Sequence, residues 1–130
     1  MVILDTHVWV WWIHDDQHLS QTQFDFIKAN ENKDIGISAI SLWEVAKLVE
    51  CGRLELPISL EEWFEYALDY PGIRVCELTH QIAIESTRLP GTFHRDPADQ
   101  IIVATARLLE CPLITSDSKI LAYTHIQTIG

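Results

Sequence analysis

The chain has 130 residues, a length that suits one domain and is too short for two. It carries 9 Lys and Arg against 19 Asp and Glu, a net charge of -10, which argues against a protein that holds nucleic acid through its own basic side chains. We therefore predict a single domain over residues 1–130, in which any action on nucleic acid needs positive charge from outside, such as a divalent metal. An acidic surface also suits a basic protein partner.

The pattern of apolar residues indicates a folded chain without a membrane segment, and hydrophobic residues make up 48% of the sequence. Asp5 interrupts the first apolar run, so this run does not resemble a signal peptide, and no other run reaches the roughly 18 to 20 apolar residues of a membrane span. We expect a cytoplasmic protein. Cys51, Cys76 and Cys111 are widely spaced and odd in number, which argues against a disulfide framework or a cysteine zinc site. We expect them to be small buried hydrophobes.

Short apolar strands alternate with helical patterns along the chain. Residues 2–4 predict a buried strand that ends at Asp5. The further expected strands are 35–37, 74–78, 113–115 and 126–129. The expected helices are 6–13, 21–30, 39–50, 59–70 and 79–88, one that opens at Pro97, and a helical turn at 118–122. This alternation predicts a three-layer α/β/α domain with a mainly parallel central sheet of four to five strands.

The first expected helix contains Trp9, Trp11 and Trp12, which make it apolar nearly all round. Such a helix is typically covered on more than one side. The tryptophans are then core residues, or one or two of them line a groove for another chain.

The stretch from His94 to Ala106 combines a helix start with two carboxylates. Asp96 before Pro97 fits an N-cap with proline at the first helical position. Asp99 lies in the first turn, near the positive end of the helix dipole. One interpretation is purely structural, with the two carboxylates forming a capping arrangement.

Carboxylates from four separate segments are expected at one edge of the sheet, outside the carboxyl ends of the strands, where such sheets bind ligands. Asp5 and Asp117 each follow an apolar strand directly, and Asp99 opens a helix that starts at the same edge. Glu44 lies roughly 9 Å along the helix after the second strand, so it reaches the others only if that helix leans over the edge.

Such a cluster is expected to need a cation. Like charges at close range raise one another's pKa and destabilise the fold unless a positive ion lies among them. Oxygen ligands with room for water suit Mg²⁺ or Mn²⁺ rather than zinc, and such sites catalyse phosphoryl chemistry. Asp5 and Asp117 also fit plain helix caps, so this prediction depends on the joint pattern.

Four blocks of sequence also carry a resemblance. They are I-L-D-T-H-V at 3–8, S-A-I-S-L-W-E-V-A at 38–46, R-D-P-A-D-Q-I-I-V-A-T-A at 95–106 and L-I-T-S-D at 113–117. Together they span nearly the whole chain and resemble the PIN-domain family, in particular the VapC-like ribonuclease toxins of bacterial toxin-antitoxin pairs.

The resemblance implies a PIN-like fold with an acidic metal site. The acids that it assigns to this site, by position, are Asp5, Glu44, Asp99 and Asp117, the first three being the family's triad. The supporting neighbours that it implies are Asp96, Thr6, Ser41 and Ser116. It also implies one or two Mg²⁺ or Mn²⁺ ions, endonucleolytic cleavage of structured RNA, a homodimer, and inhibition by an antitoxin protein whose segment fills the groove.

Arg95 and Lys47 are the basic residues that we expect first at a phosphate, although a solvated surface charge is the commoner explanation for each of them. Two other functions stay open. One is a metal-dependent DNA nuclease, which a chain of this length without a DNA-binding appendage suits less well. The other is a non-catalytic module that binds a partner through its tryptophans and uses its carboxylates as helix caps.

Overall fold

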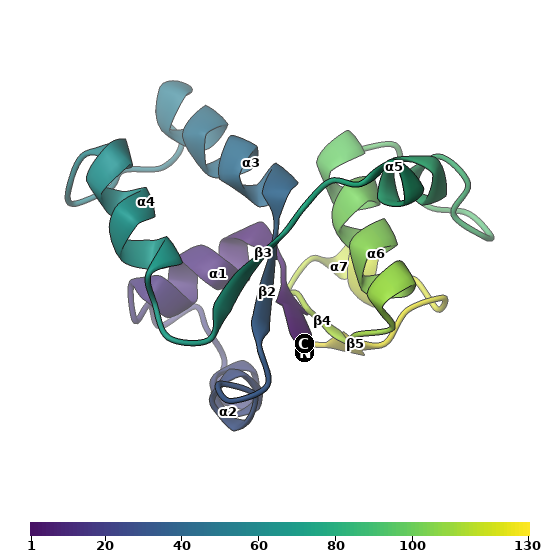
Figure 1. Ribbon diagram of the computed structural model, residues 1–130, viewed down its shortest axis with the longest axis horizontal. Helices are drawn as coiled ribbons and strands as arrows, with labels where there is room; N and C mark the ends of the chain where they lie inside the picture. Colours follow the sequence, from purple (N-terminus) through teal and green to yellow (C-terminus); the bar gives the residue numbers. More distant parts are fainter.

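The computed structural model describes residues 1–130, in which five strands and seven helices alternate (Figure 1). The strands are β1 (Val2–Leu4), β2 (Ile35–Ser38), β3 (Ile73–Cys76), β4 (Leu113–Ile114) and β5 (Thr128–Ile129). The helices are α1 (Thr6–Ile13), α2 (Gln21–Ala29), α3 (Ala39–Glu50), α4 (Leu60–Leu68), α5 (His80–Ser86), α6 (Pro97–Leu109) and α7 (Ser118–Leu121). The predicted α/β architecture is confirmed.

All the strands are parallel and lie in the order β3-β2-β1-β4-β5. The central strand is β1, in which Ile3 lies opposite Gly36 of β2 and Leu113 of β4. Because the strands run in one direction, their carboxyl ends lie at one edge of the sheet. Helices α1 and α3 leave from this edge, and α6 begins beside it, in the upper middle of Figure 1.

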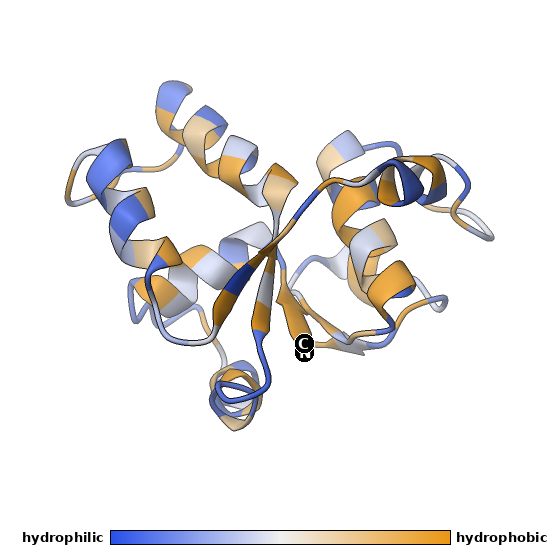
Figure 2. Cartoon of the chain, viewed as in Figure 1, coloured by the Kyte–Doolittle hydropathy of each residue, from blue (hydrophilic) through white to orange (hydrophobic).

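The two faces of the sheet bury two separate cores, as alternation along a strand requires. On one face Leu4 packs in a cluster with Trp9 of α1 and Trp63 of α4. On the other face Ile3 packs in a cluster with Ile102 of α6. Figure 2 shows apolar stripes on the helices that flank the sheet, with hydrophilic residues on their outer sides. The domain therefore has the three layers expected from the sequence.

The helix starts follow from the capping residues in the sequence. Ser20 and Gln23 form a complete capping box at the start of α2. The side chains of Ser38, Ser59 and Asp96 cap α3, α4 and α6. Each cap satisfies backbone N–H groups that have no partner within the helix.

Four strands differ from their predicted bounds: β2 is one residue longer and β4 one residue shorter, while β3 and β5 differ more. β3 ends at Cys76 instead of residue 78, because it pairs with β2, which ends at Ser38 where α3 is capped. β5 covers only Thr128–Ile129, because β4 offers it two residues to pair with. Strand length is thus set by the neighbouring strand rather than by the apolar run alone.

The burial of single residues was predicted less well. Cys76 is buried as expected, but Cys51 is exposed at the C-terminal end of α3 and Cys111 is only partly buried. Trp9 and Trp12 are core residues, whereas Trp11 is only partly covered. No helix in the chain combines the length and the apolar character required to cross a membrane.

Gly72 is expected to tolerate no side chain. Its φ is +87°, and a Cβ there would lie 2.6 Å from the backbone oxygen of Glu31. Gly52 is a matched control, since its φ is +71° but nothing lies within 4 Å of its Cβ position. We expect Gly52→Ala to lower the free energy of unfolding by about 1 kcal/mol through backbone strain alone, and Gly72→Ala by about 3 kcal/mol. Urea denaturation measures both, and equal losses would contradict the steric part of the argument.

Candidate active site

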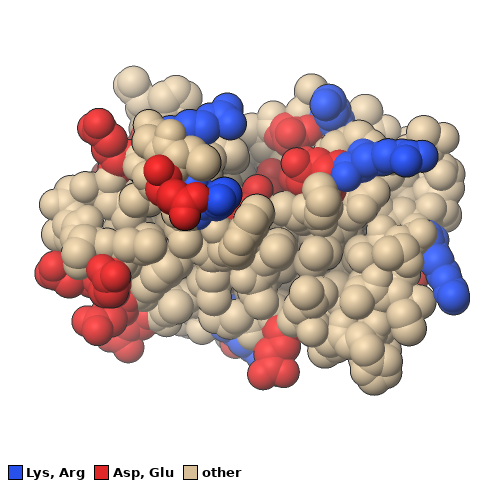
Figure 3. Space-filling model, turned by 90° about the horizontal axis from the view of Figure 1, so that it is seen from above, with Lys and Arg blue, Asp and Glu red and all other residues tan.

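One hollow of about 330 Å³ at the carboxyl edge of the sheet is lined by six of the predicted site residues. They are Asp5, Glu44, Asp96, Asp99, Ser116 and Asp117. His7 and Trp11 complete the lining. Figure 3 looks down on the molecule from above the view of Figure 1, and acidic side chains gather in and beside the central hollow, with Lys and Arg side chains on either side. The fold therefore brings together residues from four separate segments.

Asp5 lies buried between β1 and α1, which it precedes as N-cap. One of its carboxylate oxygens accepts a hydrogen bond from the backbone N–H of Thr6 at 2.9 Å, and the other accepts one from the hydroxyl of Thr115 at 2.7 Å. The Thr115 hydroxyl oxygen in turn accepts from the backbone N–H of Asp117 at 3.0 Å. Burial raises the pKa of Asp5 against the opposing effect of the Thr115 hydrogen bond.

Glu44 reaches the same hollow from the interior of α3. The hydroxyl of Thr6 donates to its Oε1 atom at 2.6 Å. Since this uses the only hydroxyl hydrogen of Thr6, the Ser41 hydroxyl 2.8 Å away is the donor to Thr6. Burial raises the pKa of Glu44 to about 7; the Thr6 hydrogen bond opposes this shift, and the charges of Asp5 and Asp99 add to it. Glu44 therefore lines the same hollow as the other carboxylates, the condition under which the sequence places it with them.

Asp99 is held at the start of α6 by a histidine that precedes the helix. Its Oδ2 atom lies 2.6 Å from Nε2 of His94, whose ring packs against Phe93 with the ring centroids 4.3 Å apart. The cap of the helix is Asp96, which accepts a hydrogen bond from the backbone N–H of Asp99 at 3.0 Å. The capping interpretation thus fits Asp96 but leaves the side chain of Asp99 in the hollow. Burial raises the pKa of Asp99, and the hydrogen bond with His94 opposes this.

Asp117 has the clearest structural role of the four acids. Its Oδ1 atom accepts from the backbone N–H groups of Lys119 and Ile120, so it caps α7. The neighbouring Ser116 hydroxyl accepts a hydrogen bond at 2.8 Å from the buried side-chain amide of Gln23, which ties α2 to the end of β4. Both residues lie on the rim where β4 meets α7.

Loss of water contributes most to the raised pKa values of Asp5, Glu44 and Asp99. The prediction from like charges alone is therefore incomplete, because the neighbouring carboxylates add to the shift but rank below burial. Burial and repulsion between carboxylates both disfavour the charged form of each acid. A cation in the hollow would stabilise this charged form.

The donor set fits a hard divalent cation, because every predicted ligand offers oxygen and the hollow has room for water. As the side chains stand, however, no group of three His, Cys, Asp or Glu residues is arranged to hold a metal ion. Both oxygens of Asp5 and one oxygen each of Asp99 and Asp117 take part in hydrogen bonds, but each carboxylate oxygen keeps a second lone pair that can bind a metal. Because no three of these side chains surround one point, metal binding would require them to move closer together, or water to bridge the carboxylates and the ion.

Comparison with known proteins identifies the family. The family model for the PIN domain matches residues 2–125. The chain belongs to the PIN-domain family. It is also similar to Ribonuclease VapC22 of Mycobacterium tuberculosis, with 32% identity over 124 residues that cover 95% of this chain and 92% of the relative. The resemblance carried by the four sequence blocks is confirmed.

Solved structures share the fold at low sequence identity. VapBC2 from Rickettsia felis, bound to a promoter DNA fragment, matches with a TM-score of 0.71 and 14% identity, covering 99% of this chain and 98% of the other. FitAcB from Neisseria gonorrhoeae matches with a TM-score of 0.69 and 18% identity, covering 100% and 97%. A toxin-antitoxin complex from Klebsiella pneumoniae matches with a TM-score of 0.68 and 19% identity, covering 100% and 97%. At these identities the matches show that this PIN domain has the same fold.

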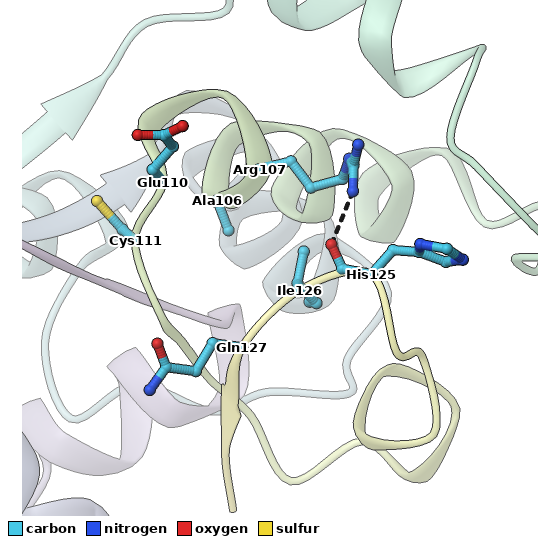
Figure 4. A pocket seen from close by; sticks show the side chains of 7 residues that line it. All are labelled: Ala106, Arg107, Glu110, Cys111, His125, Ile126 and Gln127. Atoms are coloured by element: carbon cyan, nitrogen blue, oxygen red, sulfur yellow. Dashed lines mark hydrogen bonds between the residues drawn. The ribbon is translucent and has the colours of Figure 1, made fainter.

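The basic residues of this PIN domain take different places. Arg95 is exposed and lines a second hollow of about 620 Å³ beside the start of α6. Lys47 forms an ion pair with Glu50 on the exposed side of α3. Arg107 has a structural role: its guanidinium donates to the carbonyl of His125 at 2.7 Å, which fixes the segment before β5 to α6 (Figure 4). Neither Arg95 nor Lys47 lines the acidic hollow, so their contact with a phosphate stays a prediction.

Several residues in or beside the hollow were not predicted as site residues from the sequence, although Trp11 was one of the tryptophans expected either in the core or along a groove for another chain. Thr115 and His94 hold the carboxylates of Asp5 and Asp99, while His7 and Trp11 line the hollow. His94 stands two residues before the cap Asp96, and Thr115 closes an apolar strand, so both signals are present in the sequence. The sequence alone indicates no role for either residue, because only the fold places each of them beside a carboxylate.

Proposed function

We propose that this PIN domain is a metal-dependent endoribonuclease, the toxin of a toxin-antitoxin pair, which hydrolyses RNA phosphodiester bonds. The observation that carries this is the meeting of Asp5, Glu44 and Asp99, each with a raised pKa, in one hollow. The chain in which they meet is 32% identical to a protein named as a ribonuclease. Raised pKa values of this kind cluster at functional sites.

The residues proposed to hold one or two Mg²⁺ or Mn²⁺ ions are Asp5, Glu44, Asp99 and, as the fourth acid, Asp117. A metal bound there supplies positive charge for the phosphate and lowers the pKa of a water. The chain itself supplies orientation. Thr115 fixes the carboxylate of Asp5, and His94 fixes that of Asp99. Thr6, supported by Ser41, fixes that of Glu44.

The alternative of a non-catalytic module fits the structure less well. Asp5, Asp96 and Asp117 each cap a helix, as that interpretation requires. Glu44 caps no helix, and it lies in the interior of α3 with a pKa of about 7. A carboxylate kept there at a cost in stability favours a catalytic site over a purely structural one.

Partners follow from the proposed class of toxin. The similar solved structures include complexes of toxins with antitoxins, and we propose that an antitoxin protein binds and inhibits this chain as well. The acidic surface suits a basic segment of such a partner. We further propose a homodimer in the cytoplasm, which analytical ultracentrifugation of the isolated protein would test.

The decisive experiment is cleavage of labelled single-stranded RNA and of single-stranded DNA with the same sequence. We expect the RNA to be cut internally in Mg²⁺ or Mn²⁺ and the DNA to stay intact. We expect EDTA to stop the reaction, because the carboxylates are negatively charged and repel a phosphate unless a metal ion lies between them. Cutting of the DNA would favour the alternative function, a metal-dependent DNA nuclease. A protein that cuts neither RNA nor DNA, and melts at the same temperature with and without metal, would support the binding module.

A further inference from the structure

Trp11 differs from the other tryptophans of α1. Trp9 is fully buried and Trp12 is 8% exposed, both inside the core. Trp11 packs against that core with part of its ring but also lines the acidic hollow, where it is the one hydrophobic residue. The ring of Trp11 is thus fixed in place by the core and still borders the hollow.

A side chain of the protein already stacks on the ring of Trp11. The imidazole of His18 stacks on it, with 5.5 Å between the ring centroids and 23° between the planes. His18 comes from the polar segment between α1 and α2, and its side chain is 67% exposed. The stack shows that this ring face accepts a planar nitrogen heterocycle. The imidazole is held there by an exposed contact between its Nδ1 atom and the Asp16 carboxylate at 2.7 Å, which an incoming base would have to break.

Because the net charge is -10, an RNA enzyme of this kind needs affinity for its substrate that does not depend on basic side chains, and an aromatic ring face can supply it. Contacts from Lys and Arg to the phosphate backbone supply most of the affinity of ordinary RNA-binding proteins, and this chain has only 9 such residues. Stacking of a base on an aromatic ring does not depend on charge and contributes about tenfold in affinity for each base.

We propose that Trp11 stacks an unpaired nucleobase of the RNA, next to the phosphate that lies in the acidic hollow, with the base taking the place of His18. This inference rests on the proposed ribonuclease function. The substrate would then be RNA that is unpaired and unstacked at the cleavage site, because bases within a duplex do not present their faces to a protein side chain.

The test uses a single-stranded oligoribonucleotide that contains a site cut by the wild-type protein, mapped first on total RNA. We expect Trp11→Leu to raise KM about tenfold and to change kcat by less than about threefold, while Trp11→Phe, which keeps a flat ring, changes KM by less than about threefold. The matched control is Trp43→Leu on α3, because Trp43 is 57% exposed and does not line the hollow. It is expected to leave both constants unchanged.

A cycle with abasic nucleotides identifies the stacked base. We expect one abasic position near the cut to raise KM about tenfold in the wild-type protein and to have no further effect in Trp11→Leu. Independent, additive effects at every position would overturn the inference, as would a Trp11→Leu protein whose KM equals that of the wild type. Failure of the proposed function is recognised separately, because the wild-type protein would then cut no RNA.

Discussion

Replacing Asp99 by Asn is expected to abolish metal-dependent cleavage of RNA, with kcat/KM falling at least about 100-fold. Asn has nearly the same shape and keeps an oxygen that can accept a hydrogen bond from His94, so the start of α6 stays in place. Only the negative charge of the side chain is lost. Cleavage rates measured on the same labelled RNA give the comparison.

The control for this substitution is Asp69→Asn, which makes the same change in net charge at an exposed position after α4. It is expected to retain full activity. The metal-free Asp99→Asn protein is expected to unfold at the same or a higher temperature than the wild type, because a poorly solvated charge is removed. A large loss of stability would instead identify Asp99 as a structural residue, and undiminished cleavage would remove it from the proposed metal site.

The second large effect is a pH dependence of stability in the metal-free protein. Glu44 has a pKa of about 7 in the folded chain against an ordinary value of 4.5, so between these limits the folded state binds more protons than the unfolded state. The free energy of unfolding therefore falls as the pH rises from 5 to 7 and then levels off. We expect a fall of about 1 to 2 kcal/mol from this residue, reduced from the full shift because its side chain is partly solvated.

Urea denaturation in EDTA at pH 5, 6, 7 and 8 measures this slope, and Glu44→Gln isolates the contribution of one carboxyl group. The Gln variant is expected to lose that part of the slope and to be more stable than the wild type at pH 8. Added Mg²⁺ should flatten the wild-type profile, because a bound cation favours the charged carboxylates. A Glu44→Gln profile that runs parallel to the wild-type profile would show that the burial of Glu44 has no effect on stability.

Local signals in the sequence were sufficient to predict the order of the strands and helices and to name the acids that line the hollow. The apolar run 2–4 closed by Asp5, the capping box at Ser20 and the Asp96-Pro97 start of α6 all act within a few residues of chain, and each is formed as predicted. The four sequence blocks likewise indicate the family by their residues and order alone, and the family match confirms it.

The sequence determined which side chains are available to the hollow, because strand ends and helix caps are local features. Only the tertiary structure decided how those side chains are held. The hydrogen-bond partners of Asp5, Glu44 and Asp99 are Thr115, Thr6 and His94, and two of these contacts join residues far apart in the chain. It also decided that desolvation outweighs repulsion, and that Trp11 rather than Trp9 or Trp12 faces the hollow. Burial and long-range hydrogen bonds depend on which elements pack together, and no local pattern in the chain encodes that.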